Sequence, residues 1–561
     1  MQARLRQSGG ALLVEALRTH GTRHLFCVPG ESFLAVLDAL HDCPEIAVTV
    51  CRQEGGAAMM ADAHGKLTGE PGVCFVTRGP GATNASAGVH VAFQDSTPLI
   101  LLIGQIARSD EEREAFQEVD YRRMFGPLAK WVAQVNDAAR IPEFLARAFR
   151  TATSGRPGPV VLAFPEDVLS DLAESRPVER YQAVQAHPDP ERLRELAHSL
   201  AAAERPLVVV GGGGWSAAAS ADLARFAAAW DLPVAASFRC QDYLDNDHPN
   251  YCGDLSLGGN PALFRRLEEA DLILAVGPRL GDVTTNGYTA MVPPVPRQKL
   301  LHIHTDAEEI GRVYQPAVGI NAGSAAALAA LAGLPAPAEV RWHGQRQEAR
   351  KFYEGWNAPA ANPGPVQMAD VVGWLRAQLP EDAIVTNGAG NYAAFVQRYF
   401  RFRQYRTLLA PTSGSMGYGV PAAVAAKRIH PDRTVVAFAG DGCFQMHGQE
   451  FGTAAQYGLP IIVIVVNNGM YGTIRMHQER HYPGRVSATG IVNPDFARLA
   501  EAYGGFGIRV ERTEEFASAF AAAKASGRPA LIEIRLDPEA ITTRQSLSDI
   551  RRAAERAQPA L

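Results

Sequence analysis

Short runs of apolar residues recur along the chain, separated by longer segments with helical periodicity. In the N-terminal third, the apolar runs occupy residues 24–28, 46–50, 73–77, 98–103 and 159–164. Runs of this length that alternate with helical segments are typical of βαβ units, in which crossover helices join parallel strands. The pattern therefore predicts an α/β domain with a parallel sheet over residues 1–175.

Two further blocks repeat this alternation. The middle block has apolar runs at 206–210, 233–237, 271–276 and 300–304, and the last block has them at 383–386, 434–439, 461–466, 507–510 and 530–534. Loose segments near 170–192 and 334–365 separate the blocks. We therefore predict three consecutive α/β domains with parallel sheets, over residues 1–175, 190–335 and 365–540, and a C-terminal tail of residues 541–561. The first and last blocks could be distant copies of one topology.

Length and composition narrow the class of protein. A chain of 561 residues is too long for one core, and 47% hydrophobic with 20% charged residues is ordinary globular usage. The net charge of -5 provides no basic surface for nucleic acid or for a membrane. The longest clean apolar run, 461–466, is far shorter than a membrane span. We expect small-molecule or subunit partners, no nucleic acid and no membrane.

The cysteines indicate the compartment. Seven are scattered along the chain without a CxxC pair, at positions 27, 43, 51, 74, 240, 252 and 443. This distribution fits reduced thiols better than a disulfide framework or a zinc site. The prediction is a cytoplasmic protein.

The most informative feature lies in the last block. Gly440-Asp441-Gly442 follows one apolar run, and Asn467-Asn468 ends the next, with the second Asn 27 positions after the Asp. Both groups lie at predicted strand exits, where open α/β sheets bind ligands. Magnesium prefers a carboxylate, an amide and a carbonyl together with phosphate oxygens. Each half alone is a common turn signal, but the joint pattern predicts a metal diphosphate site.

Two stretches of the first block carry further candidates. Glu54 opens the Gly/Ala-rich sequence EGGAAMMADAHGKLTG after run 46–50, and the turn GPGATN occupies 79–84 after run 73–77. Glu54 alone would usually be a helix-dipole partner, and the turn alone a tight strand-to-helix corner. In order and spacing, all of these stretches together resemble thiamine diphosphate enzymes of the acetolactate synthase large (catalytic) subunit type, over roughly residues 8–550.

The resemblance implies a fold and a set of partners. It implies a pyrimidine-binding domain, a middle Rossmann-like domain and a diphosphate-binding domain, in that order. The implied cofactors are thiamine diphosphate and Mg²⁺. Because the family joins Glu54 of one subunit to Asp441 of another, a homodimer or homotetramer with the active site at the subunit interface is expected.

The resemblance also implies a role for each matching residue. Glu54 would be the catalytic carboxyl that activates the aminopyrimidine. Asp441, Asn468 and the carbonyl of Met470 would bind the metal. The other implied cofactor-binding residues are Gly390, Asn391, Gly414, Met416, Gly442, Cys443 and Tyr471, with Met416 wedged beneath the bent cofactor. Ala115-Phe116-Gln117-Glu118 and Lys130 match positions at the mouth of the family's active site.

Departures from the family pattern gather around the substrate. Gln53 stands where a His is usual, Glu31 and Ser32 stand where small residues are expected, and Val283 replaces an Arg that would hold an acceptor carboxylate. Thr473 and His477 replace the Met and Trp of the second-substrate pocket. Glu31 could repel an acidic substrate, relay a proton or be a surface cap. The predicted substrate pocket therefore comprises Glu31, Ser32, Gln117, Thr473 and His477.

The middle block contains a second Gly-rich turn. Gly211 to Gly214 follow run 206–210, and Asp231 lies 20 residues beyond Gly211. This spacing is compatible with dinucleotide binding. FAD is therefore possible, although Val283 departs from the FAD-type pattern.

Our leading hypothesis is a thiamine diphosphate- and Mg²⁺-dependent 2-oxo acid decarboxylase and carboligase resembling acetolactate synthase, with pyruvate as default donor. The alternative within the class is a glyoxylate carboligase, a sulfoacetaldehyde acetyltransferase or a simple 2-oxo acid decarboxylase. Two alternatives lie outside the class of thiamine diphosphate enzymes. One is a flavin or nicotinamide oxidoreductase centred on Gly211 to Gly214, and the other is a catalytically silent paralogue. An oxidoreductase would tolerate Asp441→Ala, and a silent paralogue has no reason to keep Glu54, Asp441 and Asn468 together.

Overall fold

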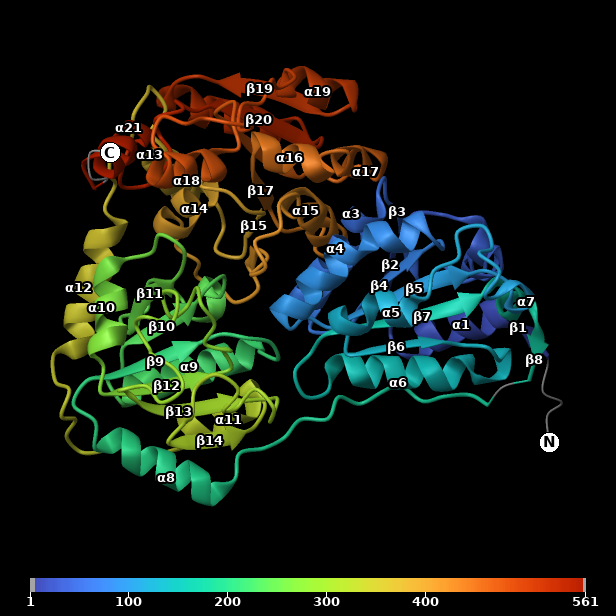
Figure 1. Ribbon diagram of the computed structural model, residues 1–561, viewed down its shortest axis with the longest axis horizontal. Coiled ribbons are helices and arrows are strands. Elements are labelled where there is room, and N and C mark those ends of the chain that lie inside the picture. The colour runs from blue at the N-terminus through green and yellow to red at the C-terminus, as the bar shows by residue number, and fades with distance from the viewer. Residues whose placement is uncertain (1–5, 175, 558–561) are drawn as a thin grey trace. The chain divides into compact units, whose positions relative to one another are not determined.

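A computed structural model describes residues 6–174 and 176–557. The chain forms two compact units, one of residues up to 184 with 424–431, and one of residues 185–423 with 432 onward. The first unit holds one six-stranded parallel sheet, and the second unit holds two more (Figure 1). The predicted class of three α/β domains with parallel sheets is thus confirmed, while the limits of the domains stay predictions. Within the described ranges, no helix is long and apolar enough to cross a membrane.

The first domain has the strand order β3-β2-β4-β5-β7-β6. Its strands are β2 (His24–Cys27), β3 (Ala47–Val50), β4 (Gly72–Val76), β5 (Leu99–Gln105), β6 (Trp131–Gln134) and β7 (Pro159–Pro165). Its helices are α1 (Gly9–Thr19), α2 (Leu34–His41), α3 (Glu54–Thr68), α4 (Pro80–Asp95), α5 (Tyr121–Phe125), α6 (Ile141–Thr153) and α7 (Glu166–Ser170). A short antiparallel pair of β1 (Gln7–Ser8) and β8 (Leu172–Ala173) ties its two ends together.

The middle domain has the order β11-β10-β9-β12-β13-β14. Its strands are β9 (Pro206–Val210), β10 (Val234–Ser237), β11 (Tyr251–Leu255), β12 (Leu272–Val276), β13 (Lys299–His304) and β14 (Val318–Asn321). Its helices are α8 (Pro190–Ala201), α9 (Ala217–Ala229), α10 (Pro261–Glu269), α11 (Ser324–Ala332) and α12 (Gln345–Asn357). Helices α8, α9 and α11 pack on one face of the sheet, and α10 and α12 pack on the other (Figure 1).

The third domain has the order β16-β15-β17-β18-β20-β19. Its strands are β15 (Ile384–Asn387), β16 (Leu408–Leu409), β17 (Val435–Gly440), β18 (Ile462–Asn467), β19 (Phe506–Val510) and β20 (Ala530–Arg535). Its helices are α13 (Met368–Gln378), α14 (Tyr392–Tyr399), α15 (Gly419–Ile429), α16 (Asp441–His447), α17 (Glu450–Gln456), α18 (Gly472–His481), α19 (Phe496–Ala502), α20 (Phe516–Ala525) and α21 (Leu547–Ala557).

The first and third sheets share one topology. In both, the strands taken in chain order lie in the spatial order second, first, third, fourth, sixth, fifth. The middle sheet has the order third, second, first, fourth, fifth, sixth, which is the doubly wound order of Rossmann domains. The structure therefore confirms both the repeated topology and the Rossmann-like middle domain. Each sheet has a switch point, where the chain reverses its direction of winding and loops can enclose a ligand.

Sequence patterns found most strands but not all of them. Every predicted run coincides with a strand to within two residues at either end. The strands β1, β6, β8, β11, β14 and β16 were not predicted. The loose segment 334–365 was an error in part, because it contains α12, which packs on β11 and α10. Helix α12 buries few residues, chiefly Ala349 and Tyr353, so its sequence resembled that of a charged loop.

Candidate active site

The loops after β15 and β17 enclose a cavity of about 240 Å³ at the carboxyl edge of the third sheet. These two strands flank the switch point of this sheet, since the chain winds outward from β15 to β16 and returns beside β15 as β17. The predicted cofactor-binding residues of this domain all line the cavity: Gly390, Asn391, Gly414, Met416, Asp441, Gly442, Cys443, Asn468, Met470 and Tyr471. The structure thus brings together residues that are up to 81 positions apart in the chain.

Asp441 begins α16 directly after β17 and is buried, with 2% of its surface exposed. Its Oδ1 accepts a hydrogen bond from the N–H of Gly442, and its Oδ2 accepts one from the N–H of Gly469, both at 2.9 Å. Burial raises the pKa of this carboxyl, and the hydrogen bonds to its oxygens partly offset that effect. A cation beside the carboxylate would favour its charged form.

The loop after β18 places an amide and a carbonyl in the same wall. The side-chain Oδ1 of Asn468 accepts a hydrogen bond from the N–H of Met470 at 3.3 Å. The main chain of Met470 forms an isolated antiparallel bridge with Gly490, and the N–H of Tyr471 donates to Thr489 at 2.9 Å. This second segment fixes the loop, so its polar groups stay at the cavity without a ligand.

Asn493 is a site residue that the sequence did not reveal. Its Nδ2 donates to Asp441 Oδ2 at 2.7 Å and to Asn467 Oδ1 at 2.9 Å. Its Oδ1 accepts from Gln445 at 2.9 Å. Asn493 thereby holds the two candidate metal loops together. The only sequence signal is an Asn-Pro turn, which is too common to single it out.

The loop after β15 forms another wall. Asn391 donates to the carbonyl of Ile541 at 2.9 Å, and its Oδ1 accepts from the hydroxyl of Thr473 at 2.9 Å. Thr473, predicted for the substrate pocket, therefore lines this cavity and orients Asn391. Ile541 and Ala540 also line it, so the C-terminal segment contributes a wall that was not predicted.

Cys443 and Tyr392 lock the floor of the cavity. The hydroxyl of Tyr392 accepts from the N–H of Gly388 at 3.1 Å and lies 3.2 Å from the sulfur of Cys443. That sulfur also accepts from the N–H of Gly417 at 3.2 Å. Both side chains are buried. Cys443 therefore fixes the loop after β15 against the segment that contains Gly414 and Met416.

The residues present fit a magnesium diphosphate. Asp441 is the only acidic or basic side chain among the lining residues, and the other candidate ligands are neutral oxygens. No cluster of three His, Cys, Asp or Glu residues exists in the described part of the chain, so a cation here needs anionic oxygens from its ligand. A Cβ at Gly442 would lie 2.7 Å from Tyr471, and one at Gly440 would lie 3.0 Å from Tyr392. Glycine at both positions therefore lets these aromatic side chains pack directly against the backbone that lines the cavity.

The first unit holds the other predicted residues. Glu54 begins α3, and its Oε2 accepts from Asn84 at 3.0 Å. A Cβ at Gly81 would lie 3.3 Å from Glu54 Oε1, so the GPGATN turn passes directly beside this carboxyl. Gln53, which replaces the usual His, caps α3 by accepting from the N–H of Gly56 at 3.1 Å. A structural capping role thus accounts for Gln53.

Glu31 has a partner that the sequence did not indicate. Its side chain is 62% exposed, and Oε1 lies 3.5 Å from Nη2 of Arg78. Arg78 is largely buried and donates to Glu166 at 3.0 Å. Ser32 is buried and its hydroxyl lies 2.8 Å from that of Thr77. Glu31 and Ser32 line a separate cavity of about 280 Å³ between the segments that follow β2, β5 and β7.

Three further predicted residues have different outcomes. Gln117 lies against the turn, since a Cβ at Gly79 would be 2.6 Å from Cβ of Gln117. Lys130 instead donates to the carbonyls of Thr151 and Ser154 at the end of α6. His477 is absent from the lining of the third-domain cavity and stacks on His481, with ring centroids 6.3 Å apart.

The Gly-rich turn of the middle domain is filled by the chain itself. The Trp215 indole donates to the carbonyl of Gly211 at 2.8 Å, and the Tyr243 hydroxyl donates to that of Gly212 at 2.6 Å. The two rings pack at 4.7 Å, and Tyr405 packs on Tyr243 at 5.5 Å. These residues do not fit a dinucleotide at this switch point, since a ligand would have to displace packed aromatic rings, of which Trp215 is buried and Tyr243 and Tyr405 are partly buried.

Asp231 does not fit the dinucleotide interpretation either. It precedes β10, at the opposite edge of the sheet from the Gly-rich turn, and its carboxylate pairs with Arg346. A dinucleotide site would carry an acidic residue shortly after the carboxyl end of β10. The chain has Arg239 there, which is basic. The spacing of 20 residues was therefore a coincidence.

Comparison with known proteins agrees with this geometry. Three thiamine pyrophosphate enzyme domains match the chain: the N-terminal TPP binding domain at residues 7–124, the central domain at 193–331 and the C-terminal TPP binding domain at 388–534. The fold and the cavity thus define a thiamine diphosphate-dependent enzyme.

Full-length relatives define the family more closely. The chain is 34% identical to an acetolactate synthase large subunit of Parasynechococcus marenigrum, over 94% of this chain and 87% of the relative. It is 32% identical to that of Haemophilus influenzae and 34% identical to the isozyme 3 large subunit of Escherichia coli, each over 91% of both chains. The chain belongs to the acetolactate synthase family and is a thiamine diphosphate-dependent carboligase.

Proposed function

We propose that the protein decarboxylates a 2-oxo acid, with pyruvate as default donor, and joins the remaining acyl unit to a second carbonyl compound. The observation that supports this most is the cavity at the β15/β17 switch point, where one buried carboxylate meets neutral oxygen ligands and a glycine-lined space. When bound, thiamine diphosphate supplies the carbon nucleophile and the electron sink for decarboxylation.

In this proposal, Asp441, Asn468 and the carbonyl of Met470 hold Mg²⁺, while Gly390 and Asn391 contact the diphosphate. The carbonyl of Gly414 would accept a hydrogen bond from the cofactor's amino group, and Met416 would support its rings. The other cofactor contacts are Gly442, Cys443 and Tyr471. Asn493 orients the Asp441 carboxylate, so that its oxygens are preorganised for the cation.

Glu54 would share a proton with the far nitrogen of the aminopyrimidine ring. A partly buried carboxyl at a helix start, beside a tight Gly-Pro-Gly turn, can approach a planar ring closely. Following the family pattern, Glu54 of one subunit serves the cavity of another. We therefore propose a homodimer or homotetramer that completes each active site at a subunit interface.

The acceptor is where this chain departs from the family pattern. Val283 cannot bind a carboxylate, Thr473 is tied to Asn391, and Glu31 pairs with Arg78. These contacts favour an altered acceptor pocket, so a glyoxylate carboligase, a sulfoacetaldehyde acetyltransferase or a simple decarboxylase is the second candidate. FAD is not part of the proposal, because aromatic side chains fill the turn that would bind it.

The location we propose is the cytoplasm. All seven cysteines are free and buried. Buried free thiols need no oxidising compartment, and this distribution supports a reducing one.

The test is to supply thiamine diphosphate, Mg²⁺ and a panel of 2-oxo acids, and to follow carbon dioxide release while identifying products. We expect carbon dioxide and a new carbon-carbon bond with the wild-type protein. Glu54→Gln should lower turnover by about 100-fold to 10,000-fold, since it removes an acid-base group.

The matched control is Glu143→Gln, which changes another first-turn Glu in the same unit but at an exposed position. This variant should retain wild-type turnover. Carbon dioxide release without a carbon-carbon bond would favour the simple decarboxylase. Full turnover of Glu54→Gln would refute the assigned role of this residue.

A further inference from the structure

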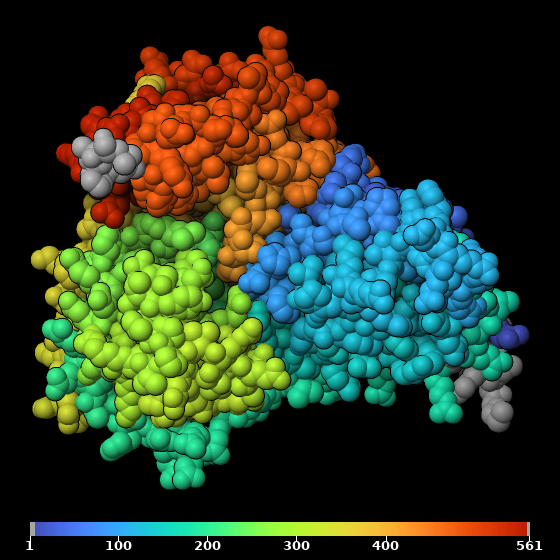
Figure 2. All heavy atoms as spheres, in the orientation of Figure 1, coloured from blue at the N-terminus to red at the C-terminus, as the bar shows by residue number. Residues whose placement is uncertain are grey.

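A segment of the middle domain runs along the third domain within the second unit. Residues 239–247, here called the bridging segment, follow β10. Gln241 donates to the carbonyl of Gln397 at 2.8 Å, and Asp242 accepts from the N–H groups of Thr407 and Leu408 at 3.0 and 3.2 Å. Through these contacts the middle and third domains pack against each other (Figure 2).

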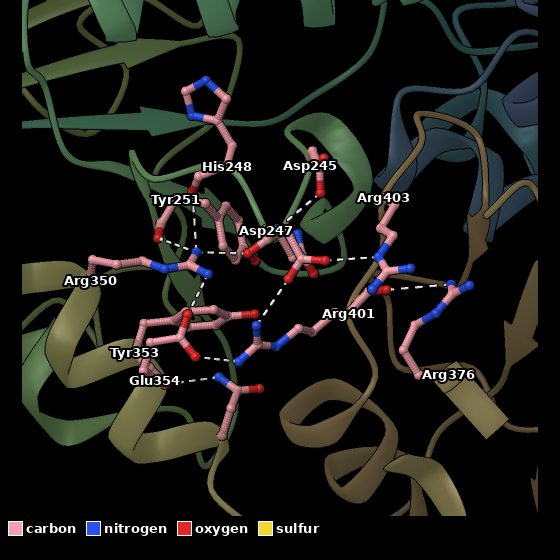
Figure 3. Close-up of polar contacts among 12 residues, drawn as sticks. Asp245, Asp247, His248, Tyr251, Arg350, Tyr353, Glu354, Arg376, Arg401 and Arg403 are labelled. Carbon is pink, nitrogen blue, oxygen red and sulfur yellow. Dashed lines mark hydrogen bonds and ion pairs between the residues drawn. The ribbon is translucent and has the colours of Figure 1, made fainter. Parts of the chain in front are cut away.

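The solvent-facing end of the bridging segment is anchored by ion pairs. Figure 3 shows Asp247 between two arginines of the third domain, with Arg401 at 2.9 Å and Arg403 at 2.7 Å. Arg401 also pairs with Glu354 of α12. Next to Asp247, Asn246 exchanges two hydrogen bonds with the main chain of Phe402. This end therefore fixes the position of the whole segment.

The buried end of the segment reaches the active-site loop. Arg239 is 8% exposed and has a φ of +66°, which is uncommon for a residue other than glycine. Its guanidinium donates to Oδ1 of Asn387, and its Nη2 donates to the carbonyl of Gly388 at 3.0 Å. These two residues lead directly into Ala389 and Gly390, which line the cavity.

The contact with Gly388 controls the direction of a peptide group. Because a trans peptide is planar, its C=O and the following N–H point in opposite directions. When Arg239 holds the carbonyl of Gly388, the N–H of Ala389 therefore points away from Arg239. Tyr392 holds the N–H of Gly388 itself, at 3.1 Å. The two contacts hold the consecutive peptide groups 387–388 and 388–389, so the backbone of Gly388 between them has little rotational freedom.

We propose that Arg239 is a positioning residue, which acts from the middle domain and sets the loop 388–391 for the diphosphate. The inference rests on the proposed cofactor site and adds to it a role for the middle domain. That role is support of the cofactor loop, in place of binding a nucleotide. A fixed cation next to the loop also favours an anionic ligand there.

The test measures binding of thiamine diphosphate to the full-length protein by calorimetry, with Mg²⁺ in excess. Arg239→Gln should raise the Kd by about tenfold to 100-fold, the range typical when an outer-shell partner is lost. Turnover at saturating cofactor should change much less, because the loss affects binding and not the chemical step. Arg239→Lys keeps the charge but not the forked guanidinium, so its Kd should lie between those of the wild-type protein and Arg239→Gln.

The control is Arg376→Gln. Arg376 is equally buried and also donates to main-chain carbonyls, those of Leu379 and Pro380, but these precede β15 at the opposite edge of the sheet. It should lower the melting temperature without changing the Kd. Asn387→Ala combined with Arg239→Gln should bind no more weakly than the weaker single variant, since the two residues act together.

A second measurement needs no cofactor. Amide hydrogen exchange of residues 388–391 should be faster in Arg239→Gln than in the wild-type protein or Arg376→Gln. An unchanged Kd in Arg239→Gln, or a change no larger than in Arg376→Gln, would overturn the inference. If the wild-type protein itself bound no thiamine diphosphate, the proposed function would fail, while the exchange result would still report on the contact of Arg239 with the loop.

Discussion

The second unit contains two switch points that look alike in sequence and differ in structure. One lies between β15 and β17 in the third domain, and the other lies between β9 and β12 in the middle domain. Each has glycines at or directly after the end of a buried parallel strand, Gly440 and Gly442 in one case and Gly211 to Gly214 in the other. The first opens into a cavity of about 240 Å³, and the second is packed with aromatic rings.

The difference lies in the neighbours of the glycines. At Gly442, a Cβ would lie 2.7 Å from Tyr471 and 3.1 Å from Ile491, and both Gly442 and Tyr471 line the cavity. At Gly211, a Cβ would lie 1.9 Å from the Ser237 hydroxyl, and at Gly212 it would lie 2.0 Å from the carbonyl of Gly277. Glycine allows close packing at both switch points, but in the third domain Gly440 and Gly442 also line a cavity.

The largest expected effect compares the two acids that the motifs singled out. Asp441→Ala should abolish Mg²⁺-dependent binding of thiamine diphosphate and lower turnover by at least about 1,000-fold, because it removes the only carboxylate of the cavity. Asp231→Ala should leave both properties unchanged and lower stability only slightly, by loss of a part-exposed ion pair with Arg346.

Calorimetry with thiamine diphosphate and a carbon dioxide assay measure both variants. Equal effects of Asp441→Ala and Asp231→Ala would contradict the proposed difference between the two switch points. Retained activity in Asp441→Ala would revive the oxidoreductase hypothesis, which does not need this residue.

A smaller effect is expected from the glycines themselves. A Cβ in Gly442→Ala would force Tyr471 and Ile491 to shift, from 2.7 and 3.1 Å, and we expect about a tenfold loss of cofactor affinity from such overpacking. Gly214→Ala meets no atom within 4 Å but has a φ of +76°. It should lower stability by about 1 kcal/mol through backbone strain, without a change in cofactor affinity.

Titration with the cofactor and thermal melts separate these outcomes. If Gly214→Ala also lowered the affinity for the cofactor, the middle-domain turn would contribute to the cofactor site.

The elements that could be predicted are those with strong local patterns. All of β9 (Pro206–Val210) is buried, so an unbroken apolar run revealed it. By contrast, β6 is only half-buried, β16 has two residues, and β11 carries Gly253 and Asp254 within the strand. Their strand character comes from pairing with neighbours, which no local pattern records.

The same limit applies to the site. Asp441 and Asn468 were predictable because distinctive chemistry sits at two strand exits only 27 residues apart. Asn493, Ile541 and Arg239 reach the site from distant segments and are ordinary residue types. Their roles depend on which atoms the fold brings together, such as Arg239 with the carbonyl of Gly388. The Glu31 pair with Arg78 was missed for this reason too.

The last comparison concerns how the two switch points respond to pH. The C-terminal segment, which contributes Ile541 to the third-domain cavity, is held by Glu479 of α18. Arg551 of α21 donates to both oxygens of Glu479, at 2.8 and 2.6 Å, and this contact lowers the pKa of Glu479 from 4.5 to about 2. Because the pKa falls on folding, the stabilisation is complete above pH 4.5 and is lost as pH falls toward 2.

Hydrogen exchange of α21 should therefore stay slow at pH 5 and accelerate below it, after correction for intrinsic rates. Glu479→Gln should accelerate it about tenfold to 100-fold already at pH 7, since Arg551 loses a charged partner. Asp549→Asn, which breaks an exposed pair with Arg552 on the same helix, should have little effect. The middle-domain turn, held by Trp215 and Tyr243, should keep its protection over this range. Equal loss of protection at both switch points would mean that acid unfolds the unit as a whole and not the wall of the cavity.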